Sequence, residues 1–235
     1  MTETERIYLS LGARFVTPFD ELKAKLKNIR AVIYDWDGVF NNGAKSGNGS
    51  STFSEVDSMG TNLLRYSFYL KNNSLPLSAI ISGEKNETAF YFSKRECFHY
   101  SVFKAANNKI DALNFICEKE KIQPSEVAYF FDDVLDLSMA EVCGVRILVN
   151  QKANPLFVNY CVKHKLVDYL TASAGGSHAV RESTELLIEM NGNFEKVMTD
   201  RKNSATEYKE YLEKRQAIIT QYFTFADGKF EKADL

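Results

Sequence analysis

Residues 29–38 read Ile-Arg-Ala-Val-Ile-Tyr-Asp-Trp-Asp-Gly, and this stretch decides the fold of the chain. Ile29–Tyr34 is a short β-branched run with the length of one buried strand, and an acidic turn follows it directly. Further along, apolar runs of strand length alternate with segments whose apolar residues recur at helical spacing. Because this alternation is typical of βαβ units, the sequence predicts an α/β protein with a parallel sheet covered by helices on both faces.

The other expected elements follow one another with short connections. We expect strands at Leu77–Ile81, Tyr100–Phe103, Val127–Phe131 and Val145–Val149, and helices at Asp57–Lys71, Glu84–Arg95, Asn108–Lys121 and Asp133–Val142. In a sheet of this kind the ligand binds beyond the carboxyl ends of the strands. The polar clusters of this sequence fall at those ends, so the site is expected there.

Two segments interrupt the alternation. Phe40–Glu55 is rich in Asn, Gly and Ser and suits a β-hairpin, which would overhang the end of the first strand as a flap. Near the C-terminus, a polar segment contains an expected helix over about Phe194–Phe223. We therefore divide the chain into an N-terminal extension (1–27), a main domain (28–190) and a polar C-terminal helical extension (191–235).

The composition excludes several classes of protein. A net charge of −2 gives no reason to expect nucleic acid or an anionic membrane as a partner, and a 45% hydrophobic fraction predicts a buried core. The first residues lack the basic and apolar regions of a signal peptide, and no apolar run approaches the ~20 residues that span a bilayer. The four cysteines do not occur in closely spaced pairs, so we expect them to be reduced thiols in the core. We expect a cytoplasmic protein.

Asp35 and Asp37 are the candidate reactive groups. Residues i and i+2 of an extended backbone point to the same side, so both carboxylates can face one reacting group. One carboxylate can attack a phosphorus atom covalently while the other moves the proton of the leaving alcohol and of water. Gly38 lets the chain turn and brings backbone N–H groups near a phosphate. The alternative interpretation is a polar turn after a strand.

A second acidic cluster follows the strand Val127–Phe131. It contains Asp132, Asp133 and Asp136. Carboxylates that converge from two strands repel one another unless a cation lies between them, and Mg²⁺ needs only one or two such ligands. The alternative for Asp133 and Asp136 is capping of a helix N-terminus, which leaves Asp132 as the favoured ligand.

Two further positions can hold a phosphate group. Ser82-Gly83 ends a strand and precedes a helix, so its hydroxyl and the following amides can bind phosphate oxygens, although the pair is also a common turn. Lys109 opens the next helix and can neutralise both phosphate and carboxylates. Lys104 is the competing lysine, and a solvated surface lysine is the alternative for either.

In this order, Asp35–Gly38, Ser82, Lys109 and Asp132-Asp133 resemble the four motifs of the haloacid dehalogenase (HAD) superfamily. Residues 35–43, Asp-Trp-Asp-Gly-Val-Phe-Asn-Asn-Gly, are similar to the start of 3-deoxy-D-manno-octulosonate 8-phosphate (KDO 8-phosphate) phosphatases. The stretches 108–113 (Asn-Lys-Ile-Asp-Ala-Leu) and 175–182 (Gly-Gly-Ser-His-Ala-Val-Arg-Glu) also resemble segments of that family, and the first favours Lys109 over Lys104.

The resemblance implies a Rossmann-like three-layer domain with no large cap and a Mg²⁺-dependent phosphatase that hydrolyses a small sugar-acid phosphate. It implies a homotetramer in which a neighbour's flap and tail help to close the site. The implied catalytic residues are Asp35, Asp37, Ser82 and Lys109, with metal ligands among Asp35, Asp37, Asp132 and Asp133. The implied substrate contacts are Asp57, Ser58, Gly83, Glu84 and Arg95.

Several residues depart from the family pattern. Glu84-Lys85 stands where arginine is usual and resembles phosphatases that act on nine-carbon sialic-acid-type 9-phosphates, although Phe92 occupies the position of a basic residue in those enzymes. Asn42, Phe131 and His178 replace an aspartate and two glycines. The alternatives are therefore a nine-carbon substrate, or a weakly active relative that serves as a protein-interaction module.

Overall fold

The computed structural model describes residues 1–107, 109–226 and 228–233, and in these residues nine strands form one sheet with the order β1-β7-β6-β5-β2-β3-β4-β8-β9. Asn108, with which the expected helix Asn108–Lys121 begins, lies outside the described residues. The strands are β1 (Arg14–Phe15), β2 (Ala31–Tyr34), β3 (Leu77–Ile81), β4 (Tyr100–Phe103), β5 (Val127–Phe131), β6 (Val145–Leu148), β7 (Tyr169–Leu170), β8 (Gln221–Ala226) and β9 (Lys229–Lys232).

Strand β2 lies at the centre of the sheet and pairs in parallel with β3 on one side and with β5 on the other. The strands from β7 to β8 run parallel, and only the edge strands β1 and β9 pair antiparallel in the described chain. The predicted parallel α/β sheet is confirmed. Its carboxyl ends meet at one edge, where the residues that follow β2, β3 and β5 come together.

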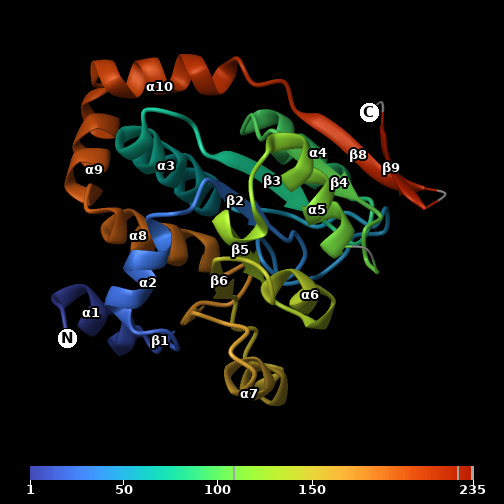
Figure 1. Ribbon diagram of the computed structural model, residues 1–235, viewed down its shortest axis with the longest axis horizontal. Coiled ribbons are helices and arrows are strands. Elements are labelled where there is room, and N and C mark those ends of the chain that lie inside the picture. Colours follow the sequence, from blue (N-terminus) through green and yellow to red (C-terminus); the bar gives the residue numbers. More distant parts are fainter. Residues whose placement is uncertain (108, 227, 234–235) are drawn as a thin grey trace.

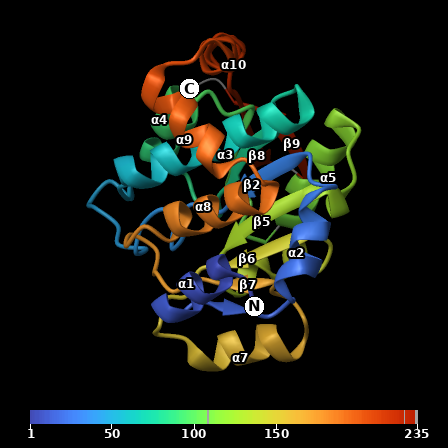
Figure 2. The same ribbon diagram turned by 90° about the vertical axis from the view of Figure 1, so that its left-hand side faces the viewer.

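Helices cover both faces of the sheet because successive residues of each buried strand point to opposite sides. In β2, Val32 and Tyr34 belong to one core cluster, whereas Ala31 and Ile33 belong to the other. Figures 1 and 2 show the two layers. The first layer contains α2 (Phe19–Leu26), α3 (Glu55–Asn72), α8 (Ala179–Asn191), α9 (Phe194–Asn203) and α10 (Thr206–Gln216), and the second contains α5 (Lys109–Glu120), α6 (Leu137–Ala140) and α7 (Pro155–Lys163). The remaining helices are α1 (Glu3–Leu11), α4 (Glu87–Arg95) and two 3₁₀ turns, η1 (Pro124–Glu126) and η2 (Val134–Asp136).

The C-terminal segment differs from its expected helix. The helix predicted through Phe223 is divided at Ser204 and ends at Gln216, after which the chain forms β8 and pairs in parallel with β4. The prediction was wrong for these last residues because β4 would otherwise be an edge strand with unpaired backbone groups, and the aromatic run of β8 satisfies them. Figure 1 shows β8 beside β4 and α10 lying across the top of the molecule.

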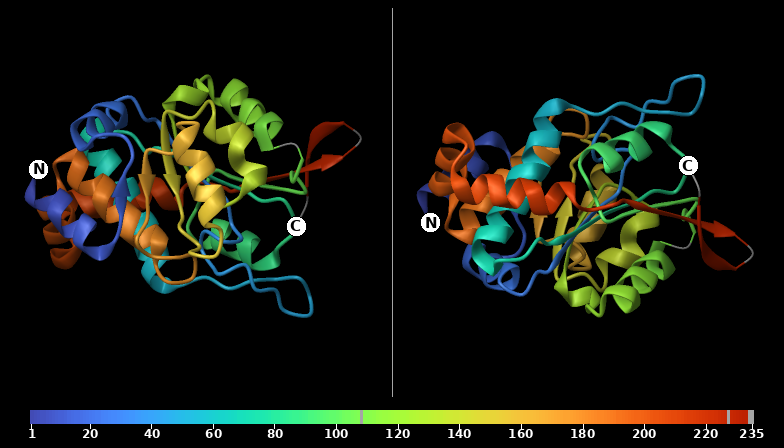
Figure 3. Two further views of the ribbon diagram at one scale, coloured as in Figure 1. Left: turned by 90° about the horizontal axis from the view of Figure 1, so that it is seen from below. Right: turned by 90° about the horizontal axis from the view of Figure 1, so that it is seen from above.

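Residues 40–55 form a projecting loop rather than a two-stranded hairpin, since they contain no strand. A tight turn closes its tip, where the N–H of Gly49 donates to the carbonyl of Ser46 at 2.9 Å. Both views of Figure 3 show this blue loop extending beyond the rest of the fold. The Asn-Gly turn was predicted, but the ladder of a hairpin does not form on either side of it.

An aromatic cluster anchors the base of the loop. Trp36 and Phe40 stack at 5.0 Å between ring centroids, and Phe92 of α4 packs against Phe40 at 4.8 Å and against Phe53 at 4.9 Å. Phe92 is fully buried, so this position holds a core side chain in place of a basic residue. None of the helices in the described residues combines the length and the apolar character needed to cross a membrane.

Candidate active site

A hollow of about 660 Å³ lies at the carboxyl ends of β2, β3 and β5. Each of these strands delivers one predicted group to it: Asp35 follows β2, Ser82 follows β3 and Asp132 follows β5. Lys109, the first residue of α5, also lines the hollow. The sheet therefore brings together residues that are up to about a hundred positions apart in the chain, as the ordering of the motifs predicts.

Lys109 connects two carboxylates in this hollow. Its Nζ lies 3.0 Å from Oδ1 of Asp35 and 2.5 Å from Oδ1 of Asp136, and all three side chains are buried. Burial acts to lower the pKa of Lys109, but the two carboxylates outweigh it and raise that pKa above its usual value. Lys109 is therefore a fixed positive charge beside Asp35. Lys104 is exposed and has a left-handed backbone, so the structure favours Lys109 of the two lysines.

Three carboxylates crowd the floor of the hollow. One oxygen each of Asp35, Asp132 and Asp136 lies within 4.8 Å of the others. Burial is the main cause that raises the pKa of Asp35, to about 7, and of Asp132, to about 8, while the neighbouring carboxylates raise both further and Lys109 opposes them. Ionised, the three carboxylates and Lys109 leave a net charge of −2. A divalent cation cancels that charge, so the donor set fits Mg²⁺, which accepts a small number of carboxylates.

Gly38 makes this close approach possible. Its φ of 80° lies in the left-handed region, and a Cβ at this position would come within 1.9 Å of Oδ2 of Asp132. Gly175 packs against the same turn, since a Cβ there would meet the Gly38 carbonyl oxygen at 2.0 Å. The side-chain amide of Gln151 donates to that carbonyl and, at 3.2 Å, to Oδ2 of Asp132. The lack of a side chain at Gly175 therefore allows the Gly175-Gly176 segment to pack closely against the turn after β2.

Asp37 also lines the hollow but does not belong to the three-carboxylate cluster, and both of its oxygens have partners in the projecting loop. The hydroxyl of Ser51 donates to Oδ1 at 2.6 Å, and the ammonium of Lys45 contacts Oδ2. Ser51 is itself fixed, because it accepts hydrogen bonds from Nε1 of Trp36 at 3.0 Å and from Nδ2 of Asn86 at 2.8 Å. The projecting loop is therefore tied to the predicted acid–base residue.

Asp133 and Asp136 of the second acidic cluster have different partners. The Asp133 carboxylate accepts a hydrogen bond from the N–H of Val134 at 2.7 Å and caps η2, which matches the capping alternative. Asp136 also accepts from the N–H of Asp133, at 3.3 Å, but its other oxygen contacts Lys109 and the hydroxyl of Tyr129, the latter at 2.5 Å. Asp136 thus joins the buried cluster, whereas Asp133 lies at its rim.

The predicted phosphate and substrate contacts fall into two groups. Ser82, Gly83 and Glu84 line the hollow. Asp57 is fully buried, where its Oδ1 accepts from the N–H of Arg181 at 2.9 Å, and Ser58 donates to Glu96. Arg95 forms a two-pronged ion pair with Glu55. Asp57, Ser58 and Arg95 therefore do not line the hollow of their own chain.

The replacements of family glycines have local explanations. His178 is the N-cap of α8 and adopts a φ of 71°, the left-handed conformation that a glycine takes without strain. Its Nδ1 lies 3.8 Å from Oδ2 of Asp57. Phe131 is fully buried at the end of β5 and stacks on Tyr129. Neither residue displaces a group from the carboxylate cluster.

Four residues that sequence reasoning missed complete the surroundings of the site: Lys45, Ser51, Tyr129 and Gln151. Lys45 and Ser51 belong to a loop with no periodic pattern, and Gln151 follows β6, where a single amide has no distinctive spacing. Tyr129 lies within the apolar run of β5, and that run predicts only that its side chain is buried. Its hydroxyl was the one feature of the sequence that could have suggested a polar partner such as Asp136.

A parallel sheet that presents an Asp-x-Asp-Gly turn, a second carboxylate strand end and a bridging lysine at one edge defines an HAD-superfamily phosphatase. The comparisons with known proteins specify the family. The chain is 30% identical over 182 residues to the 3-deoxy-D-manno-octulosonate 8-phosphate phosphatase KdsC of Escherichia coli (strain B / BL21-DE3), covering 74% of this chain and 87% of that protein. It is also 30% identical over 178 residues to the enzyme of the same name from Salmonella typhi, covering 73% and 85%. The chain belongs to this phosphatase family.

A solved structure agrees with this assignment. The 3-deoxy-D-manno-octulosonate 8-phosphate phosphatase of Moraxella catarrhalis, in complex with magnesium ion, phosphate ion and KDO, superposes with a TM-score of 0.64 and 25% identity. The match covers 77% of this chain and 97% of that one. No family model matches the chain.

Proposed function

We propose that this protein is a Mg²⁺-dependent hydrolase of a small sugar-acid phosphate of the KDO 8-phosphate type, acting through a phosphorylated Asp35. The observation that carries the proposal is the bridge from Lys109 to Asp35 beside Asp132, because it places a buried carboxylate and its balancing charges where strand ends converge. The names of the relatives, and the KDO molecule bound by the Moraxella catarrhalis enzyme, support the substrate class.

Asp35 would attack phosphorus, forming an Asp35 Oδ–P bond while the bond from phosphorus to the sugar oxygen breaks. Asp37 would give its proton to that leaving oxygen and then take a proton from a water molecule. The activated water would attack the phosphoryl group and release inorganic phosphate and free Asp35. Lys109, the Ser82 hydroxyl and the amide of Gly83 would hold the phosphoryl oxygens and stabilise the charge that develops on them.

Mg²⁺ would be held by the carboxylates of Asp35 and Asp132 and by the backbone carbonyl of Asp37, with Asp133 at the rim. When bound, it supplies positive charge that neutralises both the carboxylates and the phosphate. The buried charge of the cluster supports this assignment.

The test measures phosphate release from KDO 8-phosphate with Mg²⁺ and after chelation, for the wild-type chain and for Asp35→Asn. We expect activity only in the wild type with Mg²⁺. Equal turnover by Asp35→Asn would overturn the proposal, since no other route to a covalent intermediate has been assigned.

A nine-carbon sugar-acid 9-phosphate is the second candidate substrate. Glu84 favours it, because this residue lines the hollow at the position where the resemblance to those phosphatases begins. Comparing kcat/KM for KDO 8-phosphate with that for a nine-carbon acid 9-phosphate decides between them. A preference for the longer substrate that disappears in Glu84→Gln would favour the second candidate.

We also propose a cytoplasmic homotetramer built from the main domain, residues 28–190. Arg95 and Glu55 support a contact with a neighbour, because their ion pair lies away from the chain's own hollow and leaves 33% and 71% of the two side chains exposed. The proposal is tested by sedimentation: a monomer that turns over substrate at full rate would contradict it. The interaction-module alternative has less support, since α10 and β8 pack on the same chain through Tyr211 and β4.

A further inference from the structure

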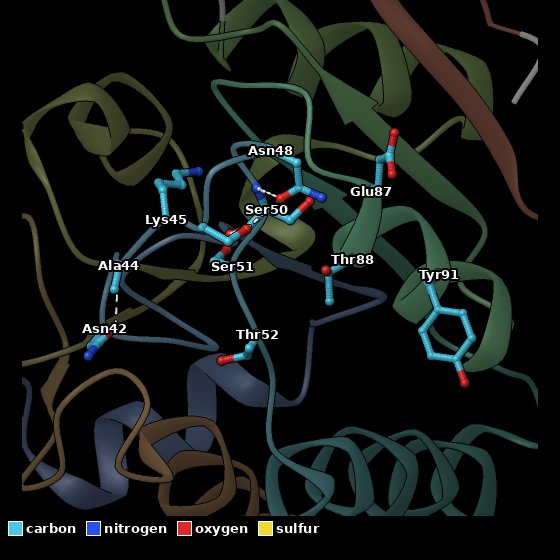
Figure 4. Close-up of a pocket in the computed structure, with 11 residues that line it drawn as sticks. Asn42, Ala44, Lys45, Asn48, Ser50, Ser51, Thr52, Glu87, Thr88 and Tyr91 are labelled. Atoms are coloured by element: carbon cyan, nitrogen blue, oxygen red, sulfur yellow. Dashed lines mark hydrogen bonds between the residues drawn. The ribbon is translucent and has the colours of Figure 1, made fainter.

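A second hollow, of about 700 Å³, lies beside the active site, between the projecting loop and the first turns of α4 (Figure 4). Asn42 lines both hollows, so the two are contiguous. Most of the groups that line the second hollow are hydroxyls and side-chain amides, among them Ser51 and Thr88. Such groups donate and accept hydrogen bonds without net charge, which suits the hydroxyls of a sugar.

Lys45 lies at the boundary between the two hollows. Its side chain lines the second hollow, while its ammonium contacts Oδ2 of Asp37 in the first. Of the residues that line the second hollow in the described structure, Lys45 alone carries a positive charge. Glu87 is the anionic residue there, and Figure 4 shows it across the hollow from Lys45. An anionic group of a ligand in this hollow is therefore attracted to the Lys45 side and repelled from the Glu87 side.

The contact between Lys45 and Asp37 is suited to exchange. The two side chains are 35% and 25% exposed, and ion pairs at such exposure are weak. Asp37 also keeps a second partner, because the hydroxyl of Ser51 donates to its other oxygen at 2.6 Å. Lys45 can thus leave Asp37 without stranding a buried charge. Its flexible stem and its place in a projecting loop give it the reach to do so.

We propose that Lys45 is a specificity-determining residue that binds the carboxylate of the sugar acid, exchanging its contact with Asp37 for one with the substrate. This inference rests on the proposed function and deepens it, since it identifies how the chain distinguishes a sugar-acid phosphate from a neutral sugar phosphate. The hydroxyl and amide groups of the second hollow contact the polyol, and Lys45 sets the position of the carboxylate relative to the phosphate held at Asp35.

The test compares kcat/KM for KDO 8-phosphate with kcat/KM for glucose 6-phosphate, an ester that lacks a carboxylate. Four proteins are measured: the wild type, Lys45→Met, Lys45→Arg and Lys94→Met. Lys94 is an exposed lysine of α4, the helix that borders the second hollow, and it does not line the hollow itself, so it is the control. Losing a hydrogen bond to a charged partner lowers binding about 10- to 100-fold. We expect the ratio of the two kcat/KM values to fall by that factor in Lys45→Met, mainly through KM for KDO 8-phosphate.

Lys45→Arg should restore most of the ratio, and Lys94→Met should leave it at the wild-type value. A second measurement, inhibition by free KDO of the hydrolysis of p-nitrophenyl phosphate, should weaken in Lys45→Met and recover in Lys45→Arg. An unchanged ratio in Lys45→Met, with both esters slowed equally, would overturn the inference while leaving the phosphatase proposal intact. Absence of phosphate release from either ester by the wild type would overturn the proposed function, and this inference with it.

Discussion

Asp136 fixes the position of Lys109: Oδ1 of the one lies 2.5 Å from Nζ of the other, and both side chains are buried. The hydroxyl of Tyr129 donates to the same Oδ1 at 2.5 Å, so Asp136 is held from the strand below. Nζ of Lys109 then lies 3.0 Å from Asp35. We therefore expect Asp136 to act as a positioning residue, because its contact with Nζ determines where the positive charge of Lys109 stands relative to the proposed nucleophile.

Replacing Asp136 by asparagine should lower kcat about 100-fold, the cost of a misplacement of about 1 Å at a reacting centre. KM should change little, because Lys109 retains its charge. Steady-state kinetics on KDO 8-phosphate provide the measurement. Tyr129→Phe is the graded control: it removes one hydrogen bond to Asp136 and should reduce kcat by about tenfold or less. Wild-type kcat in Asp136→Asn would show that Lys109 needs no such support.

Asp132 and Asp133 are adjacent in sequence but should respond differently to the same substitution. Asp132 is half-buried and shares the cluster with Asp35, whereas Asp133 is exposed and caps η2 through Val134. Asp132→Asn should raise the Mg²⁺ concentration for half-maximal activity by at least about tenfold, as even indirect partners of a bound metal do when removed. Asp133→Asn should stay near the wild-type requirement. Similar shifts in both variants would mean that Asp133 is a ligand as well.

This pair also shows what the sequence could and could not predict. A carboxylate directly after a buried strand has a defined place, because the strand end fixes its backbone, and Asp35 and Asp132 lie where they were expected. Positions two or more residues further on depend on the turn. The 3₁₀ turn η2 bends Asp136 back toward Lys109 and leaves Asp133 as a cap, and no periodicity in the sequence encodes that bend.

The same distinction holds for the fold. The strands β3, β4 and β5 have the predicted bounds, because each is a short apolar run between polar connections. Strand β8 was missed because its residues are only partly buried at one side of the sheet, so they lack the continuous apolar character of a central strand. The loop of residues 40–55 has a turn signal but no strand pairing, and contacts of Ser51 with Asp37 and Asn86 and of Lys45 with Asp37 hold it instead.

Gly38→Ala should disturb both stability and metal binding. The new Cβ would come within 1.9 Å of Oδ2 of Asp132, in addition to occupying a backbone with φ of 80°. The matched control is Gly192→Ala, where φ is also 80° but no atom lies within 4 Å of the new Cβ. Backbone strain alone costs about 1–3 kcal/mol, so Gly192→Ala should lose that amount and keep its thermal shift with Mg²⁺. Gly38→Ala should lose more stability and show no shift; equal losses with an intact Mg²⁺ response would contradict the steric argument.

The fully buried Asp168 ties the N-terminal segment to the sheet. It accepts hydrogen bonds from Thr17 at 2.5 Å and from Lys25 at 2.7 Å, and Arg146 donates to both of its oxygens at 2.8 and 2.9 Å. Burial acts to raise the pKa of Asp168, but these donors outweigh it, and the pKa lies below its usual value. The carboxylate is therefore charged in the folded protein across the neutral range.

Asp168→Asn should destabilise the protein by about 3 kcal/mol near neutral pH, because it leaves Arg146 without its buried partner. An unfolded aspartate titrates near pH 4, and the folded Asp168 titrates lower, so the unfolded state takes up the proton first as pH falls. The stabilisation is thus fully present above about pH 4 and is lost as pH falls through the folded pKa. Urea unfolding of the wild type and the variant at about pH 7, 5 and 3 provides the measurement. The difference in their free energy of unfolding should be the same at the first two pH values and smaller at the third.

The control is Asp20→Asn, which replaces an exposed carboxylate in the first turn of α2 and should cost only about 0.5 kcal/mol. A difference that grows with acid would contradict this account, because it requires a folded pKa above the unfolded value.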